Sequence, residues 1–142
     1  LWIVEAACKQ VGLKLQIAEK YSNFVPYEKM PEFYAGIDVL AIASSSEGGP
    51  NTALEAASVG RVLLSTHVGL VPQLLGASSG GIIVSRSVDD FIDGLKELQN
   101  KVDILPEWGA KNREEVEQRW QWGTQVKSLE YVLCGYLKEG GK

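Results

Sequence analysis

Two glutamates and a glycine-rich loop form the stretch of the sequence with the clearest chemical potential. Glu47 and Glu55 are separated by seven residues, and the segment between them opens with Gly48, Gly49 and Pro50. A carboxylate can accept two hydroxyl hydrogen bonds, so it suits the vicinal diols of a sugar or a ribose. Glycines leave room for a ligand to approach the backbone, because they lack a Cβ atom. The stretch therefore predicts a site for a hydroxyl-rich, phosphorylated ligand.

The same stretch is expected to start a helix. Asn51 is a favourable N-cap residue, and the N–H groups of Asn51, Thr52 and Ala53 would have no partner within the helix. A helix N-terminus of this kind is an anion site, and a diphosphate would satisfy these donors. The alternative is a plain turn from strand to helix, in which Gly48 and Gly49 serve only the backbone angles.

His67 and Gly69 follow the next expected strand, residues 61–65. Ligands of open parallel sheets bind outside the carboxyl ends of the strands, so both residues are candidates for the same site. A loop histidine can equally be a solvated side chain, and Gly69 can serve a tight turn. Similar alternatives apply to the glutamates, with Glu47 as a solvated loop charge and Glu55 as a capping-type residue.

The composition is that of a soluble globular domain, and it argues against several classes of function. The 142-residue chain carries a net charge of -4, which disfavours a nucleic-acid partner. No apolar run is long enough for a membrane span. With His67 as the one histidine, a His/Cys metal cluster has too few ligands. Cys8 and Cys134 are expected to be core thiols of a reducing compartment, with a disulfide as the alternative. The expected location is cytoplasmic, with a membrane-peripheral parent protein as the alternative.

Apolar periodicity predicts strands that alternate with helices along the chain. The expected strands are residues 13–18, 24–26, 38–43, 61–65 and 80–84. The expected helices are residues 1–10, 28–35, 51–59, 71–75, 88–102, 111–119 and 122–137. The apolar run 38–43 is typical of a central strand covered on both faces. The alternation predicts an α/β fold, a Rossmann-like parallel sheet with helices on both faces.

These residues resemble the C-terminal, nucleotide-sugar-binding domain of retaining glycosyltransferases of the GT-B fold, the glycosyl transferases group 1 or family 4-like group. The two glutamates have the family's Glu-x7-Glu spacing. Four stretches carry the resemblance around them: Tyr34-Ala-Gly-Ile-Asp-Val-Leu-Ala-Ile-Ala-Ser, Glu47-Gly-Gly-Pro-Asn-Thr-Ala-Leu-Glu-Ala-Ala, Gly60-Arg-Val-Leu-Leu-Ser-Thr and Val68-Gly69. Trp120-Gln-Trp122 before the last helix is similar to the family's Phe-Ser-Trp and closing helix. The chain would be one half of a GT-B fold.

The resemblance implies a role for each candidate residue. Glu47 would be the catalytic carboxylate that contacts the donor sugar near the reacting carbon, and Glu55 would hold the ribose hydroxyls. The residues that would wrap the sugar and diphosphate are Gly48, Gly49, Pro50, Asn51 and Thr52. The residues that would border the base are Phe24, Val25 and Pro26, and His67 and Gly69 join the donor site. The implied reaction moves a hexose to a glycan, lipid or other acceptor, with no metal and no other cofactor.

Some positions depart from the family pattern. Leu70 follows Gly69, Gln73 stands where Glu is common, and Arg61 replaces a frequent Pro. The family's phosphate-binding Arg and Lys precede the first helix, and the acceptor-binding domain precedes them. We therefore expect an N-terminal acceptor-binding domain in the parent protein and no sugar transfer by this chain alone. The rival interpretation is a non-catalytic nucleotide-binding or protein-interaction domain of doubly wound fold.

One domain is expected over residues 1–137, beginning inside a helix, with a disordered tail at 138–142. The expected last helix places apolar residues on one side: Val126, Leu129, Leu133 and Tyr136. If no other domain covers this stripe, it stays exposed to solvent. We therefore expect self-association through the C-terminal helix.

Overall fold

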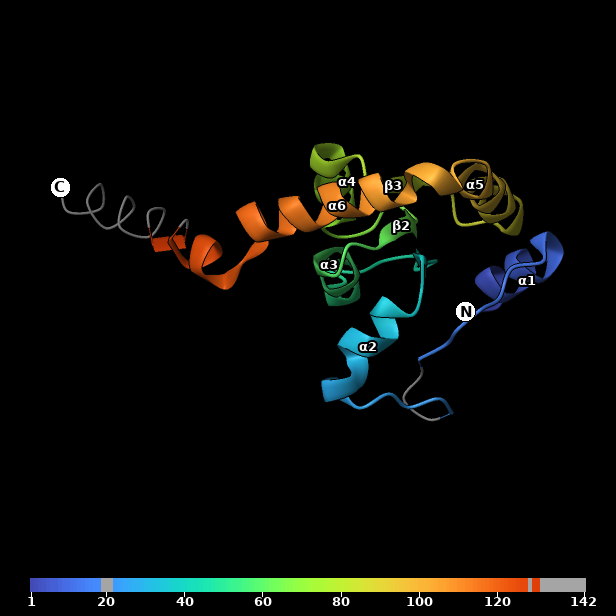
Figure 1. Ribbon diagram of the computed structural model, residues 1–142, viewed down its shortest axis with the longest axis horizontal. Helices are drawn as coiled ribbons and strands as arrows, with labels where there is room; N and C mark the ends of the chain where they lie inside the picture. The colour runs from blue at the N-terminus through green and yellow to red at the C-terminus, as the bar shows by residue number, and fades with distance from the viewer. Residues whose placement is uncertain (19–21, 128, 131–142) are drawn as a thin grey trace.

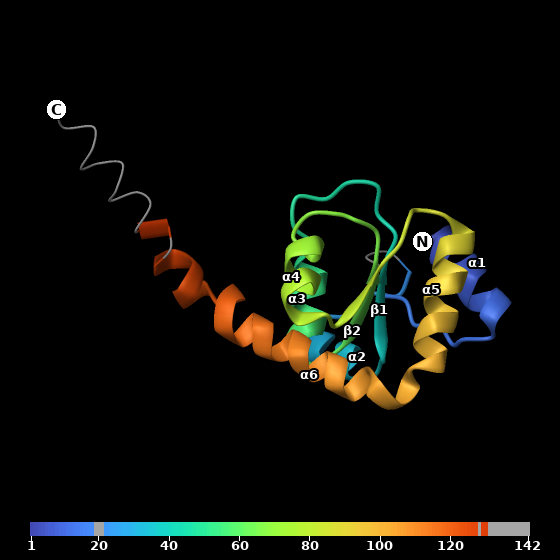
Figure 2. The same ribbon diagram turned by 90° about the horizontal axis from the view of Figure 1, so that it is seen from above.

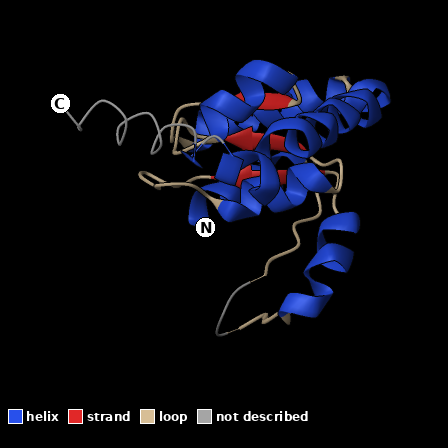
Figure 3. Cartoon of the chain, turned by 90° about the vertical axis from the view of Figure 1, so that its left-hand side faces the viewer, coloured by secondary structure: helices blue, strands red, loops and turns tan. Residues whose placement is uncertain are grey.

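A parallel sheet lies between two layers of helices (Figures 1 and 2). The structure is a computed structural model that describes residues 1–18, 22–127, 129 and 130. Its strands are β1 (Val39–Ile42), β2 (Val62–Ser65) and β3 (Gly81–Ile83), side by side in that order and all parallel (Figure 3). The predicted fold class is confirmed: the chain is a Rossmann-like α/β domain with helices on both faces.

One face of the sheet is covered by α1 (Trp2–Val11) and α5 (Val88–Asn100), which lie against each other. Val62 and Leu64 of β2 point toward this layer, and Phe91 of α5 is fully buried among them. The layer contains these helical core residues: Ile3, Val4, Ala7, Cys8, Phe91, Ile92, Leu95 and Leu98. The expectation that Cys8 is a core thiol is confirmed, and burial raises the pKa of this thiol.

The opposite face is covered by α2 (Met30–Ala35), α3 (Asn51–Ser58) and α4 (Val71–Ser78). Leu63 of β2 points toward this layer, between two neighbours that point the other way. Because β2 is buried on both faces, every residue from Val62 to Ser65 is inaccessible to solvent. This is the pattern that a near-continuous apolar run predicts.

Helix α6 (Leu105–Glu115) crosses the amino ends of the strands (Figure 2). Asn112 is fully buried there, and its amide group donates to the carbonyl oxygens of Arg61 at 2.8 Å and Gly80 at 2.7 Å. Its Oδ1 accepts a hydrogen bond of 2.5 Å from the Ser78 hydroxyl. The amino end of the sheet is therefore closed by protein, which leaves the carboxyl end for a ligand.

Shorter helical turns are also present in the described chain: η1 (Tyr27–Lys29), η2 (Val102–Ile104) and the π-helical η3 (Val116–Trp120).

Two of the predicted strands are not formed, and a third lies elsewhere than expected. Residues 13–18 and 24–26 belong to no strand, and a single bridge occurs at Asn23. Alternating apolar residues set the faces of an extended segment, but a strand also needs a neighbouring backbone to bond with. The run 38–43 forms β1 as predicted, yet β1 is at the edge of the described sheet and not at its centre.

Several helix boundaries also differ from expectation. Asn51 is not the N-cap of α3, because Pro50 takes that place in an extended conformation. Helix α4 continues to Ser78, since Gly76 stays helical inside it. Helix α6 starts at Leu105, six residues before the predicted start, with a proline in its first turn. In all these cases the element is present and its end is displaced.

The last predicted helix is described only in part. Residues 122–127, 129 and 130 are helical, and both Val126 and Leu129 are exposed. Leu133, Tyr136, Cys134 and the 138–142 tail lie outside the described residues. Self-association through this helix therefore stays a prediction. Within the part of the chain that is described, no helix is long and apolar enough to cross a membrane.

Candidate functional site

Two loops at the carboxyl end of the sheet are in direct contact. Gly69 has a φ of 49°, the left-handed region that favours glycine, so it serves the tight turn given above as its alternative role. A Cβ atom at Gly69 would lie 2.9 Å from Cδ of Pro50 and 3.0 Å from the carbonyl oxygen of Gly48. The loop after β2 therefore lies under the loop after β1, and only glycine fits at the contact.

The start of the loop after β1 is held by two side chains that sequence reasoning missed. The buried Thr66 donates its hydroxyl to the carbonyl oxygen of Ser44 at 2.7 Å. Arg86, which follows β3, donates from Nε to the carbonyl oxygen of Ala43 at 2.9 Å. Both bonds join segments more than twenty residues apart, so no local pattern could reveal them. The one available signal in the sequence was Thr66, a residue with a hydroxyl group directly after an apolar strand.

Glu47 stays at the surface of this loop. The Ser44 hydroxyl donates a hydrogen bond to Oε1 of Glu47, which fixes the direction of the carboxylate within the loop. Gly48 and Gly49 are not in the left-handed region, because the described glycines with positive φ are Gly12, Gly60 and Gly69. No atom would lie within 4 Å of a Cβ atom at Gly48. The turn therefore does not need Gly48 for its backbone angles, and the space over it is open.

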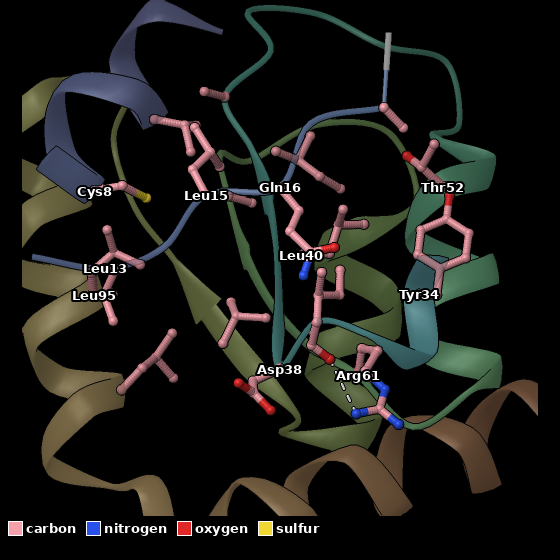
Figure 4. Close-up of a pocket in the computed structure, with 18 of the residues that line it drawn as sticks. Cys8, Leu13, Leu15, Gln16, Tyr34, Asp38, Leu40, Thr52, Arg61 and Leu95 are labelled. Atoms are coloured by element: carbon pink, nitrogen blue, oxygen red, sulfur yellow. Dashed lines mark hydrogen bonds between the residues drawn. The ribbon is translucent and has the colours of Figure 1, made fainter. Parts of the chain in front are cut away.

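The carboxylate of Glu55 is held by a hydrogen bond from a tyrosine of the neighbouring helix. It lies one turn inside α3 and is half-buried, and Tyr34 of α2 donates its hydroxyl to Oε2 of Glu55 at 2.8 Å. Figure 4 shows the Tyr34 ring pointing from α2 toward the first turn of α3, beside Thr52. Burial raises the pKa of Tyr34, and the hydrogen bond and negative charge of Glu55 raise it further. The phenol therefore keeps its proton at neutral pH and remains a donor.

The N-terminus of α3 separates the two glutamates. Pro50 is its N-cap residue, and among the described residues no side chain caps the helix. The expectation that the N–H of Ala53 lacks a partner is wrong, because it donates to the carbonyl oxygen of Pro50 at 2.9 Å. The N–H groups of Asn51 and Thr52 have no backbone partner among the described residues, and both residues are exposed. Residues three and four positions apart share one side of a helix, so Thr52 and Glu55 are neighbours on the surface of α3.

An open groove of about 1580 Å³ runs along the free edge of β1 (Figure 4). Its wall opposite β1 is the unpaired segment 13–18. At the amino end of β1, Arg61 lines the groove and donates to the carbonyl oxygen of Ile37 at 3.1 Å. At the carboxyl end, the residues that line the groove include Ser44, Ser45, Ser46, Glu47, Thr52 and Arg86.

The predicted site residues are brought together only in part. Within the described chain, Glu47 and Thr52 are the predicted site residues that line the groove. The others do not line it, although they belong to the loops after β1 and β2 and to α3: Gly48, Gly49, Pro50, Asn51, Glu55, His67 and Gly69. His67 is exposed. The predicted base-binding residues Phe24, Val25 and Pro26 are not part of the groove lining. No cluster of three or more potential metal ligands occurs among the described residues.

Comparisons with known proteins bear on the fold and the family of the chain. No curated protein matches the chain. Among solved structures, sucrose-phosphate synthase from Thermosynechococcus elongatus matches with a TM-score of 0.71 and 16% identity. The match covers 94% of this chain and 34% of the synthase, so the chain spans about a third of the length of that protein. The family model for glycosyl transferases group 1 matches residues 5–101, which is more than half of the chain. The chain therefore belongs to the glycosyl transferases group 1 family.

Proposed function

We propose that this chain is the donor-binding domain of a retaining glycosyltransferase that takes a hexose from a nucleotide-diphosphate sugar. The observation that carries the proposal is the placement of Glu47 and Glu55 on either side of an uncapped helix N-terminus at the carboxyl end of the sheet. Family membership supports the reaction class. In the full-length protein, an N-terminal domain would bind the acceptor.

Each group has a distinct task in this proposal. The half-buried carboxylate of Glu55 accepts hydrogen bonds from the ribose hydroxyls, and the exposed carboxylate of Glu47 contacts the hydroxyls of the donor sugar. When the bond between the anomeric carbon and the diphosphate oxygen breaks, negative charge builds on the diphosphate. The N–H groups of Asn51 and Thr52 and the dipole of α3 stabilise that charge. The acceptor oxygen then bonds to the anomeric carbon on the face that the diphosphate leaves, and its proton passes to the departing diphosphate oxygen.

Tyr34 keeps Glu55 ready for this task. Its hydroxyl occupies Oε2 of Glu55, so the carboxylate has one orientation before a ligand arrives. A carboxylate that is already oriented loses less conformational entropy when the ligand binds. Tyr34 is therefore a positioning residue in the proposed site.

Titration of the purified chain with uridine, guanosine and adenosine diphosphates tests the proposal. At least one of them should bind, and Glu55→Gln should weaken that binding about tenfold, because it removes a charge-assisted hydrogen bond. The matched control is Asp93→Asn, which changes an exposed carboxylate on α5, in the other helix layer. Binding that is unchanged by Glu55→Gln would place the nucleotide elsewhere.

A non-catalytic domain of the same fold is the second candidate. It is favoured by Leu70, whose Cδ2 would lie 3.4 Å from a Cβ atom at Gly49, so an apolar side chain lies against the proposed sugar loop. Such a domain would either bind a nucleotide without transferring a sugar or bind a protein and no nucleotide. The absence of binding by all three diphosphates and by their glucose conjugates would favour the protein-interaction form. Binding of a diphosphate without sugar transfer by the full-length protein would favour the nucleotide-binding form.

A further inference from the structure

Arg86 is the one residue of permanent positive charge in the three loops that leave the carboxyl ends of the strands. These loops are residues 43–50, 66–70 and 84–87, all of them within the described chain. Apart from His67, the remaining residues of these loops have uncharged or acidic side chains. The whole chain has a net charge of -4, so the positive charge of Arg86 at the carboxyl end of the sheet is opposite in sign to that of the chain.

The position of Arg86 is fixed by its own hydrogen bond. After β3 the backbone continues for one more pairing, because the N–H of Val84 donates to the carbonyl oxygen of Ser65 at 2.9 Å. Arg86 then reaches past the end of β2 and donates from Nε to the carbonyl oxygen of Ala43 at 2.9 Å. This bond places the guanidinium beside the start of the loop that carries Glu47.

The two terminal nitrogens of this guanidinium remain for a ligand. The ion pairs of the described residues involve other cations, and no carboxylate there lies within 4.0 Å of Arg86. Arg86 lines the same end of the groove as Ser44 and Thr52. A planar guanidinium whose Nε is already bonded presents its remaining N–H groups as a fork, the geometry that suits phosphate oxygens.

We propose that Arg86 binds the diphosphate of the nucleotide-sugar donor and stabilises the charge that builds on it when the sugar leaves. This assignment rests on the proposed function and names the group in the chain that supplies positive charge to that site. The N–H groups at the start of α3 give partial charge only, whereas Arg86 gives a full one. The diphosphate would lie between the two, with Glu47 on the side of the sugar.

The test measures the contribution of the phosphates to affinity separately from that of the nucleoside. For the nucleoside diphosphate that binds the wild-type chain, affinity is measured by calorimetry beside that of the matching nucleoside and of inorganic pyrophosphate. Arg86→Gln should weaken diphosphate and pyrophosphate binding at least tenfold, and it should leave the nucleoside affinity within about twofold. Arg86→Lys keeps the positive charge and loses the forked geometry, so its affinity for the diphosphate should lie between those of the wild type and Arg86→Gln.

Arg113→Gln is the matched control. Arg113 is also exposed and also lines the groove, but it lies on α6 at the amino end of the sheet and pairs with Glu117. The control should leave diphosphate affinity unchanged. The slope of diphosphate affinity against salt concentration should fall in Arg86→Gln and not in the control, because fewer charges are then screened.

The outcomes distinguish the two levels of inference. If the wild-type chain binds a nucleoside diphosphate and Arg86→Gln binds it equally well, the assignment of Arg86 is wrong and the proposed function stands. If Arg86→Gln weakens the nucleoside as much as the diphosphate, Arg86 acts by holding the loop and the assignment is also wrong. If no nucleoside diphosphate binds the wild-type chain, the proposed function fails and the assignment fails with it.

Discussion

The hydroxyl of Tyr34 donates to the carboxylate of Glu55 at 2.8 Å, although the two residues are 21 positions apart in the chain. Tyr34 is 2% exposed and belongs to α2, whereas Glu55 belongs to α3. The bond therefore ties the orientation of a candidate ligand-binding carboxylate to the packing of two helices. Changes that loosen α2 should reach the site through this contact.

Tyr34→Phe should destabilise the protein by about 1–2 kcal/mol, because a half-buried carboxylate loses its donor. The mutant should also bind a nucleoside diphosphate more weakly, since Glu55 is no longer held in one orientation. Urea unfolding and calorimetry measure the two effects. Tyr27→Phe, at a side chain that is 79% exposed, should change stability by less than about 0.5 kcal/mol. Equal stability of the two mutants would contradict the role of the bond.

Stability should fall at high pH through the same residue. The pKa of Tyr34 is raised by burial and by Glu55, so above pH 10 the folded protein holds a proton that the unfolded chain releases. The unfolded state then binds fewer protons, and the free energy of unfolding decreases as pH rises. The contribution is complete below pH 10 and is lost progressively above it. Wild type should lose stability more steeply than Tyr34→Phe between about pH 10 and 12, and parallel curves would refute this.

Gly69→Ala and Gly76→Ala should shift stability in opposite directions. At Gly69 the φ of 49° and the contacts with Pro50 and Gly48 oppose a Cβ atom, so a loss of about 1–3 kcal/mol is expected. At Gly76, inside α4, no atom lies within 4 Å of the new Cβ, so a gain of about 0.5–1 kcal/mol is expected. Thermal unfolding of both mutants measures this, and a gain at Gly69 would contradict the loop contact.

Asn112→Ala should unfold easily yet bind ligand normally when folded. Removal of the side chain leaves two buried carbonyl oxygens, those of Arg61 and Gly80, without their donor, at a cost of about 2–5 kcal/mol. Because Asn112 lies at the amino end of the sheet, diphosphate affinity at low temperature should not change. Asn100→Ala, at an exposed position at the end of α5, is the control for stability. A loss of affinity in folded Asn112→Ala would argue that the site extends to that end.

The fold class follows from sequence because it depends on local patterns. Apolar runs at residues 38–43, 61–65 and 80–84 each produced a strand, and the run at 88–102 produced α5. The order of the strands and the edge position of β1 depend on which backbone lies alongside, which no local pattern records. Residues 13–18 show this directly, since they have the pattern of a strand and no partner.

The candidate site likewise contains residues that local sequence predicts and residues that only the structure reveals. Glu47, Glu55 and the glycines are close in sequence, so their spacing alone predicts a common loop and helix. Tyr34 and Arg86 reach the site from other elements, and each acts through a hydrogen bond to a distant residue. Their types, a buried phenol and an exposed guanidinium, are common outside ligand sites. Only the structure shows that Tyr34 contacts α3 and that Arg86 contacts the start of the loop after β1.

The outer edge of β1 has a consequence for the behaviour of the chain in solution. Within the described sheet, β1 bonds to β2 on one side only, and Val39–Ile42 contains neither a charge nor a proline. Natural sheets use such residues to discourage edge-to-edge pairing. Here the edge is protected only by its four-residue length and by the segment 13–18, which faces it across an open groove, so an added strand can reach it. At high concentration the isolated chain should therefore aggregate through strand addition, a route separable from helix-mediated association by its increase in β-sheet signal.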